Sequence, residues 1–407
     1  MNVKVCDMIM GAGKTESAIT QMNEDEESKY IFVTPYLDEV KRIKDSCEKR
    51  KFSDPYNSGD GKLADLHRLL AQKSNIATTH ALFETYNEET ISLIRNGGYK
   101  LILDEVFQTT KAIEISPKDL KMLQGEKKIT TVDGLRVRWN DDKYDGKFNE
   151  LRDNCCTGNV ILYKDSLLLW EYPIEVFEAF REVIILTYMF EAQVQKYYFD
   201  VNGVEIKYIG TKHENNEFRF SNEHCIPEYV TTLIDRVHIL DDPNLNEIGD
   251  SRYSLSSSWF ERAMKKRGKP QIEQLKKNIY NAFRNKFNSE SGRIIWTVYK
   301  NYKDVVKGKG YTNGFLSCNV RATNAYRNRD CLAYCVNIFY NPLMKSYFAD
   351  QGIEVREDKY ALSEMIQWIW RSAIRDGKEI WIYVPSKRMR ELLEGWLKEL
   401  SECKAEH

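Results

Sequence analysis

The feature that most constrains this chain is a glycine-containing turn at residues 8–15, MIMGAGKT, which lies between the apolar stretch VKVCDM and the helix-like stretch TESAITQM. It matches the phosphate-binding pattern GxxxxGK[ST] except at Met8, where glycine is usual. Met8 lies at the entrance of the loop, before the amides that would hold phosphate, so the pattern still predicts a phosphate site. The predicted ligands are the backbone amides of Gly11, Ala12 and Gly13, with Lys14 on the outer phosphates and Thr15 on magnesium.

An acidic pair follows further along the chain. The stretch YKLILDEVFQ is an apolar strand that ends in Asp104 and Glu105. Carboxylates at the carboxyl end of a buried strand suit magnesium binding by Asp104 and polarisation of an attacking water by Glu105. The loop and the acidic pair together predict a nucleoside-triphosphatase.

Strands and helices alternate through the first half of the chain. YIFVTPYLDEVKRI and SNIATTHALFETY each read as a strand followed by a helix, and FREVIILTYMFEAQ supplies a strand that ends at Thr187. This alternation predicts a parallel sheet covered by helices on both faces. Ligands of such sheets collect at the carboxyl ends of the strands, where Thr34, Thr79 and His80 fall. For His80, capping or packing is an equal alternative to a ligand contact.

The length of 407 residues is too great for one ordinary core and favours two domains. We expect a first domain over residues 1–205 and a second over 206–407, joined through an irregular stretch from about 205 to 250. Within the first domain, ITTVDGLRVRW alternates around Asp133 and Gly134 and predicts a β-hairpin. We place it in an insertion at about residues 125–165.

Charge is distributed unevenly along the chain. The formal net charge is -1, yet 17 Lys and Arg residues stand against 3 acidic residues between Arg262 and Arg329. This basic stretch, which we expect to be helical over about residues 259–290, suits a polyanion whose bases can stack. A solvated helix face with buried aromatic residues explains the same pattern equally well. The interleaved aromatic residues are Trp259, Phe260, Tyr280, Phe283, Phe287, Trp296, Tyr299, Tyr302 and Tyr311.

The alternation resumes in the second half, where RIIWTVYKN, CLAYCVNIFYNP and EIWIYVPS predict three strands. Before the last of them, Gln367, Arg371 and Arg375 are spaced four apart, so on a helix they share one face. Arginines placed in this way can stabilise a transferring phosphate, whereas the alternative is a solvated helix with no such role.

On these motifs the chain resembles superfamily 2 DEAD/DEAH-like helicases, and most closely the small helicase-like ATPases of bacteriophages and prophages. The resemblance covers almost the whole chain and implies an α/β fold. That fold has two tandem RecA-like domains, each a parallel sheet flanked by helices, with an inserted β-hairpin region in the first. The segments that carry it are MIMGAGKT, FVTPYLDEV, LILDEV, LTYMF, ATNAYRNRD and QWIWRSAIR.

The resemblance also implies roles for individual residues. ATP and Mg²⁺ are the implied cofactors, and Thr187 would couple hydrolysis to motion. Three positions depart from the family pattern: Met8, Val106-Phe107 after the acidic pair, and Tyr188 in place of a small residue. The implied catalytic residues are Glu105, Gln367, Arg371 and Arg375; Asp330 would support the nucleotide, and Thr34, Thr79 and Thr323 would contact the nucleic-acid backbone.

We therefore expect an ATP-dependent helicase or translocase on single-stranded or forked nucleic acid, with DNA favoured over RNA. The resemblance further implies phage replication or recombination, with replication proteins as partners. The alternatives are a nucleotide-gated nucleic-acid-binding module without unwinding, a packaging-type motor and a small-molecule kinase. A packaging motor would need a nuclease domain with clustered carboxylates, and no segment after Glu105 supplies one.

The composition also bears on the compartment. No apolar run approaches the roughly 20 residues that span a bilayer, and the chain starts without a charged and apolar leader. The nine cysteines are scattered, which favours reduced thiols over disulfides or a zinc site. We expect a cytoplasmic protein without a membrane partner, in the bacterial host cytoplasm if a phage encodes it.

Overall fold

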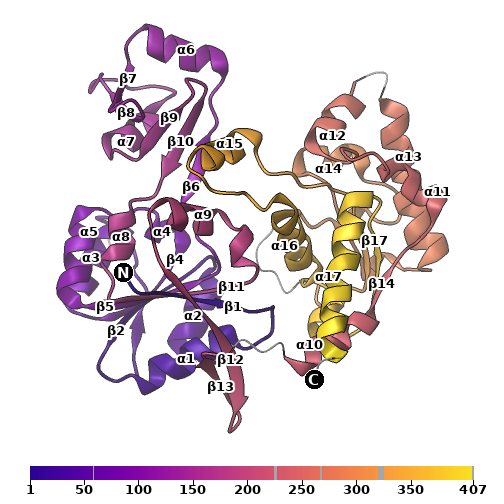
Figure 1. Cartoon of the computed structure of the whole chain (residues 1–407), viewed down its shortest axis with the longest axis horizontal. Coiled ribbons are helices and arrows are strands. Elements are labelled where there is room, and N and C mark those ends of the chain that lie inside the picture. The colour runs from indigo at the N-terminus through magenta and orange to yellow at the C-terminus, as the bar shows by residue number, and fades with distance from the viewer. Residues whose placement is uncertain (58, 224–226, 266–267, 320–324, 406–407) are drawn as a thin grey trace. The chain divides into compact units, whose positions relative to one another are not determined.

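The computed structural model describes residues 1–57, 59–223, 227–265, 268–319 and 325–405. The chain forms two compact units, and neither is one continuous segment (Figure 1). The first unit comprises Met1–Asp7, Gly13–His224 and Asn341–Val355, and the second comprises Met8–Ala12, Cys225–Tyr340 and Arg356–His407. No described helix is long and apolar enough to cross a membrane.

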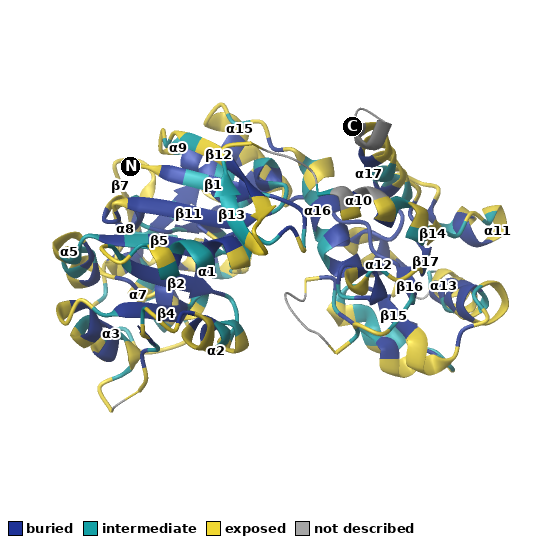
Figure 2. Cartoon of the chain, turned by 90° about the horizontal axis from the view of Figure 1, so that it is seen from below, coloured by how far each residue is buried: buried dark blue, intermediate teal, exposed yellow. Residues whose placement is uncertain are grey.

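The main sheet of the first unit has eight strands in the order β13-β12-β1-β11-β5-β2-β4-β3. All neighbouring strands are parallel except β12 and β13, which confirms the predicted parallel sheet. Figure 2 shows the central strands as buried, as expected where helices cover both faces. The strands are β1 (Val3–Asp7), β2 (Lys29–Thr34), β3 (Phe52–Ser53), β4 (Asn75–Thr79), β5 (Tyr99–Asp104), β11 (Glu182–Thr187), β12 (Ile206–Glu214) and β13 (Glu217–Ser221).

Local sequence sets the ends of some of the helices around this sheet. Asn87 caps its helix through a reciprocal pair of bonds with Thr90, and Gly98 ends the same helix in a left-handed conformation. These helices are α1 (Lys14–Glu24), α2 (Leu37–Ser46), α3 (Lys62–Ala71), α4 (His80–Phe83), α5 (Glu88–Gly97), α8 (Ile174–Glu178), η1 (Phe190–Ala192) and α9 (Val194–Val201).

The stretch after residue 205 is not irregular, and that prediction is wrong. Strands β12 and β13 form an antiparallel hairpin that extends the main sheet beyond β1. Asn215 and Asn216 form its turn, with φ of 50° and 66°. Asparagine tolerates this left-handed conformation, which a tight hairpin turn requires.

The insertion in the first unit is a second sheet rather than a single hairpin. Its five strands are antiparallel, in the order β6-β10-β9-β8-β7. The predicted hairpin is confirmed as β7 and β8, with Asp133 and Gly134 in the turn at φ of 54° and 77°. The elements are β6 (Thr110–Ile113), α6 (Pro117–Gly125), β7 (Ile129–Val132), β8 (Arg136–Trp139), α7 (Asn149–Cys156), β9 (Val160–Tyr163) and β10 (Leu167–Glu171).

Helix α15 (Pro342–Asp350) belongs to the first unit although it follows most of the second in sequence. The Tyr347 hydroxyl donates to Glu171 Oε1 at 2.7 Å, and the Tyr163 hydroxyl donates to Asp350 Oδ2 at 2.6 Å. The ring of Phe348 packs against Tyr197 with centroids 5.4 Å apart. These contacts attach the helix to both the inserted sheet and α9.

The second unit is built on a parallel sheet in the order β14-β17-β16-β15, and three of its strands are those predicted. The expected helical stretch near residues 259–290 is confirmed as α12, α13 and η4. The strands are β14 (Val237–Ile239), β15 (Ile294–Thr297), β16 (Cys331–Tyr334) and β17 (Ile380–Tyr383). The helices are α10 (Glu228–Leu233), η2 (Ile234–Arg236), α11 (Pro243–Asn246), η3 (Glu247–Gly249), α12 (Ser257–Ala263), α13 (Lys269–Asn281), the π-helix η4 (Ala282–Lys286), η5 (Ser291–Arg293), η6 (Lys300–Tyr302), α14 (Lys303–Val306), η7 (Thr312–Gly314), α16 (Glu357–Ile369), η8 (Ala373–Asp376) and α17 (Lys387–Ala405).

Most aromatic residues of the basic stretch lie in the core of the second unit. Trp296 and Tyr311 are fully buried there, and Phe260 stacks on Tyr302 with centroids 4.9 Å apart. Tyr280 is 45% exposed. The alternative of buried aromatics therefore holds for much of this stretch.

Candidate nucleotide site

The glycine-containing loop leads from β1 into α1 as predicted. Gly11 and Gly13 have φ of 84° and 76°, which side-chain-bearing residues rarely adopt. Within the loop, the Ala12 amide donates to the Ile9 carbonyl at 3.2 Å. Gly13 is the N-cap of α1 and supplies no side-chain cap. A helix start without a side-chain cap suits an anion at its first amides, which the helix dipole also favours.

Three segments far apart in sequence meet at the Asp104 carboxylate. The Thr15 hydroxyl of α1 donates to Oδ1 at 3.5 Å, and the Thr34 hydroxyl at the end of β2 donates to Oδ2 at 3.2 Å. The structure thus brings together the two residues predicted to bind magnesium. It also shows that Thr34, predicted as a nucleic-acid contact, orients the carboxylate.

The electrostatics of this cluster favour a bound cation. Burial raises the pKa of Asp104 to about 7, with a further contribution from the neighbouring Glu105 carboxylate. Burial also lowers the pKa of Lys14, although Glu105, Cys6, Asp104 and Asp7 oppose that shift. A divalent cation beside Asp104 would favour its ionised form, because opposite charges stabilise each other.

Glu105 has an unusual backbone conformation. Its φ is 65°, in the left-handed region that non-glycine residues rarely occupy, and its amide donates to the Leu186 carbonyl at 2.9 Å. Such strain costs on the order of 1–3 kcal/mol and is found preferentially at functional sites. The bond to β11 fixes this turn at the end of β5, directly after Asp104.

Other predicted residues lie at the same end of the sheet. Thr187 ends β11, and its buried hydroxyl oxygen has no hydrogen-bond partner among the described residues. Thr79 caps α4 by accepting from the Leu82 amide at 3.4 Å. His80 Nε2 lies 3.0 Å from the Asp104 carbonyl oxygen, and its ring meets Phe107 edge-on. The packing alternative for His80 is thus the one observed, while a nucleic-acid contact by Thr79 stays a prediction.

The predicted arginines of the second unit do not share a helix face, so that prediction is wrong. Gln367 lies in α16, but this helix ends at Ile369, and Arg375 belongs to the separate turn η8. Ser372 between them is extended, and its hydroxyl donates to the Ile369 carbonyl at 2.6 Å. Such a side-chain bond to the backbone competes with continuation of a helix. The catalytic roles of these residues stay predictions.

The remaining predicted residues have different outcomes. Asp330 accepts two bonds from the Arg293 guanidinium, at 2.8 and 2.6 Å, and its carbonyl accepts from the Trp381 amide at 2.8 Å. These contacts tie β17 and the start of β16 to η5, the turn before β15, and the predicted role of Asp330 at the nucleotide stays a prediction. Thr323 lies outside the described residues.

Phe218 of β13 is a neighbour of the loop that the sequence analysis missed. A β-carbon at Gly13 would lie 2.1 Å from the Phe218 ring, so glycine is required there for space as well as for φ. The His213 ring packs against the Phe218 ring, with centroids 4.7 Å apart. The paired asparagines 215 and 216, between alternating residues, were the signal that predicts this hairpin.

Two family models match the chain. The YonV C-terminal Rossmann-like domain matches residues 231–397, and the YonV middle domain matches residues 110–170, which is the inserted five-stranded sheet. A curated relative, the SPbeta prophage-derived uncharacterized protein YonV of Bacillus subtilis (strain 168), is 44% identical over 411 residues. The alignment covers 97% of this chain and 98% of the relative.

Solved structures show a similar fold at low sequence identity. XPD_APO has a TM-score of 0.51 and 11% identity, with 97% of this chain and 95% of that chain covered. The S. tokodaii Xpd4 structure has a TM-score of 0.47 and 11% identity, with 97% and 94% covered. The first of these likenesses confirms the α/β architecture with RecA-like domains.

Proposed function

This chain belongs to the YonV family, and we propose that it is an ATP- and Mg²⁺-dependent helicase or translocase that acts on nucleic acid. The observation that carries the proposal is the cluster of Thr15, Asp104 and Thr34 beside a glycine loop that opens an uncapped helix. This arrangement has the donor set that triphosphate and magnesium require. The motifs shared with superfamily 2 helicases support nucleic acid as the track, with DNA favoured over RNA.

The residues of the first unit divide the chemistry among them. The α1 amides and Lys14 would bind the phosphates, and Thr15 and Asp104 would hold Mg²⁺, which when bound neutralises phosphate charge. Glu105 would orient the attacking water and accept its proton. The fixed turn at Glu105 supports this role, because its backbone bond to Leu186 restricts where the carboxylate can lie.

The prediction that Arg371, Arg375 and Gln367 act on the transferring phosphate is kept as part of the proposal. Arg371 Nε is buried without a hydrogen-bond partner among the described residues, which is costly unless a ligand or a rearrangement satisfies it. The unsatisfied Thr187 hydroxyl has the same property and supports a role in coupling hydrolysis to motion. Since the relative is prophage-derived, we place the activity in phage replication or recombination, with replication proteins as partners.

The test is ATP hydrolysis by the purified chain, alone and with single-stranded DNA, duplex DNA or RNA. Lys14→Ala is the inactive variant, and Lys62→Ala, at an exposed position in α3, is its matched control. We expect one polymer to stimulate hydrolysis several-fold in the wild type and in the control but not in Lys14→Ala. Strand displacement on a forked substrate then separates unwinding from translocation.

Two outcomes contradict the proposal in different ways. Nucleotide binding without hydrolysis would favour a nucleotide-gated binding module. Hydrolysis that no polymer changes would remove nucleic acid as the track.

A further inference from the structure

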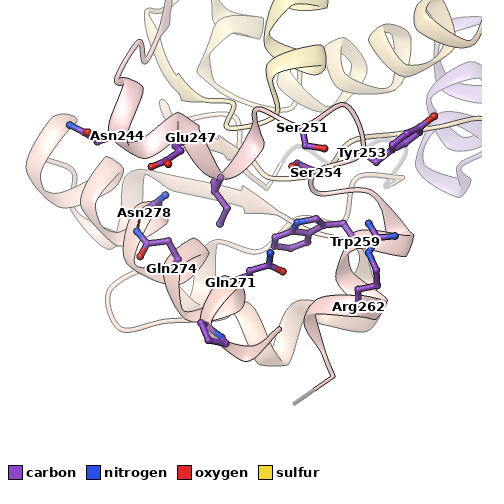
Figure 3. Close-up of a pocket in the computed structure, with 12 residues that line it drawn as sticks. Asn244, Glu247, Ser251, Tyr253, Ser254, Trp259, Arg262, Gln271, Gln274 and Asn278 are labelled. Carbon is purple, nitrogen blue, oxygen red and sulfur yellow. Dashed lines mark hydrogen bonds between the residues drawn. The ribbon is translucent and has the colours of Figure 1, made fainter. Parts of the chain in front are cut away.

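The second unit contains a cavity of about 720 Å³ whose lining includes none of the residues of the candidate nucleotide site. It is open to solvent and is lined by α11, η3 and the loop after them, by α12 and by α13 (Figure 3). Its volume is in the range of small-molecule and nucleotide sites. It also lies at the start of the basic stretch. Burial in the core accounts for most of the aromatic residues of that stretch, but it does not account for its excess of Lys and Arg.

Two aromatic residues line the cavity in different ways. Trp259 is 7% exposed and is held edge-on against Phe260, with centroids 4.9 Å apart. Tyr253 is 55% exposed and is held by Phe339, at 5.4 Å between centroids, and by the Arg252 guanidinium at 5.9 Å. Figure 3 shows the Trp259 indole among the side chains that line the cavity, beside Gln271. The cavity therefore has a fixed aromatic wall and an exposed ring on which a base can stack.

The polar residues of the cavity fall into two groups. Gln274 Nε2 donates to Asn278 Oδ1 at 2.7 Å, and Asn278 Nδ2 donates to the Leu245 carbonyl at 3.0 Å, so these amides stabilise the fold. The side chains of Glu247, Arg262 and Gln271 make no hydrogen bond or ion pair with any residue that the structure describes. All three are exposed. They are the groups available to a ligand.

Arg262 gives the cavity lining a cation that can bind a phosphate, and two lysines follow it in the sequence. Arg262 is followed by the exposed Lys265 and Lys269, neither of which has an ion pair within the described part of the chain. A guanidinium with two lysines nearby suits successive phosphates of a strand. Glu247 also lines the cavity, and its carboxylate is an acceptor that matches the exocyclic amino group of a base.

We propose that this cavity binds one nucleotide of a single-stranded nucleic acid. The base lies against Tyr253 and Trp259, its edge meets Gln271 and Glu247, and Arg262 binds the phosphate. The inference deepens the proposed function, on which it rests, by adding a nucleic-acid contact outside the motifs. It also specifies a preference: cytosine, which offers an amino group to Glu247, over thymine, which offers none.

The experiment measures binding of the full chain, without ATP, to fluorescein-labelled single strands of cytidine or thymidine nucleotides by fluorescence anisotropy. We expect Arg262→Ala to weaken binding of both strands by about tenfold and to reduce the dependence on salt. Gln271→Ala should weaken binding without changing that dependence. Lys309→Ala removes one exposed charge of the same basic stretch outside the cavity and is the matched control, with a change below about twofold.

Glu247→Ala tests the preference. We expect the wild type to bind the cytidine strand more tightly and this variant to bind the two strands alike. Thermal unfolding of each variant checks that the second unit is intact; the four altered side chains are exposed, so the melting temperatures of the variants should match the wild type.

Each alternative result has a defined meaning. Equal losses in Arg262→Ala and Lys309→Ala, or no binding of either strand by the wild type, would overturn the inference. If the wild type binds strands through the cavity yet hydrolyses no ATP, the proposed function fails and this inference stands.

Discussion

Asp104 makes the free energy of unfolding of the first unit depend on pH. The dependence has the opposite sign to that of a carboxylate whose pKa is lowered by folding. The pKa of Asp104 is raised from 3.8 to about 7, first by burial and then by Glu105. Between these values the folded protein holds a proton that the unfolded chain has lost. The free energy of unfolding must therefore fall as pH rises through this window, and level off above about pH 7.

The magnitude follows from the same two values. At about 1.4 kcal/mol per pH unit, the full effect is about 4 kcal/mol, of which about 2.6 kcal/mol falls between pH 5 and pH 8. These are upper values, because relaxation of the site reduces them. Asp104→Asn removes the titration. It also removes one acceptor for the Thr15 or Thr34 hydroxyl, at a cost of about 1 kcal/mol that does not depend on pH.

The assay is urea-induced unfolding of the wild type and Asp104→Asn at pH 5 and pH 8. Relative to the variant, the wild type should lose about 2–3 kcal/mol between the two pH values. Asp60→Asn, at an exposed position without a described partner, is the control and should follow the wild type. Magnesium should stabilise the wild type at pH 8 and so reduce the stability that it loses between pH 5 and pH 8, because a bound cation favours the ionised carboxylate.

The result that refutes this reasoning is an equal pH dependence in the wild type and Asp104→Asn. It would mean that the carboxyl group is already ionised at pH 5, and that the cluster needs no cation to balance its charge.

Three further predictions concern other contacts. Gly13→Ala should lower the free energy of unfolding by about 1–3 kcal/mol, and adding Phe218→Ala should restore part of it; strictly additive losses in urea unfolding would contradict the contact between them. Tyr347→Phe should cost about 1 kcal/mol in the same assay because Glu171, whose pKa is raised by burial, loses a donor; an unchanged midpoint would show that α15 is held without this bond. Arg371→Ala should lower the nucleic-acid-stimulated kcat at least about tenfold while ATP affinity, measured by calorimetry, is kept; unchanged turnover would exclude a role in phosphate transfer.

The central strands and the glycine loop could be predicted because local sequence determines them. Parallel strands covered on both faces must be apolar along their whole length, and residues 101–103 and 183–186 show this plainly. Asp104 and Thr187 follow from where those strands end. That Thr34 orients Asp104 could not be predicted, since the contact joins strands 70 residues apart.

The hairpin of β12 and β13 was missed because neither strand is buried along its length. Their alternation is carried by polar residues, so the hydrophobic pattern is weak and only the asparagine pair marks the turn. The end of α16 was missed for another reason. No glycine or proline follows it, and the serine at 372 ends it through a hydrogen bond that spacing alone does not reveal.

The place of α15 in the first unit has a consequence for how the protein is made. Glu171 and its partner Tyr347 are separated by 176 positions. At about 5–20 residues per second, a ribosome needs on the order of 10–30 s to add the second after the first. During that interval the inserted sheet has been synthesised, but helix α15, which packs against it, has not. The first unit therefore cannot finish folding as it emerges, and its isolated expression would require residues 341–355 to be joined back through a linker.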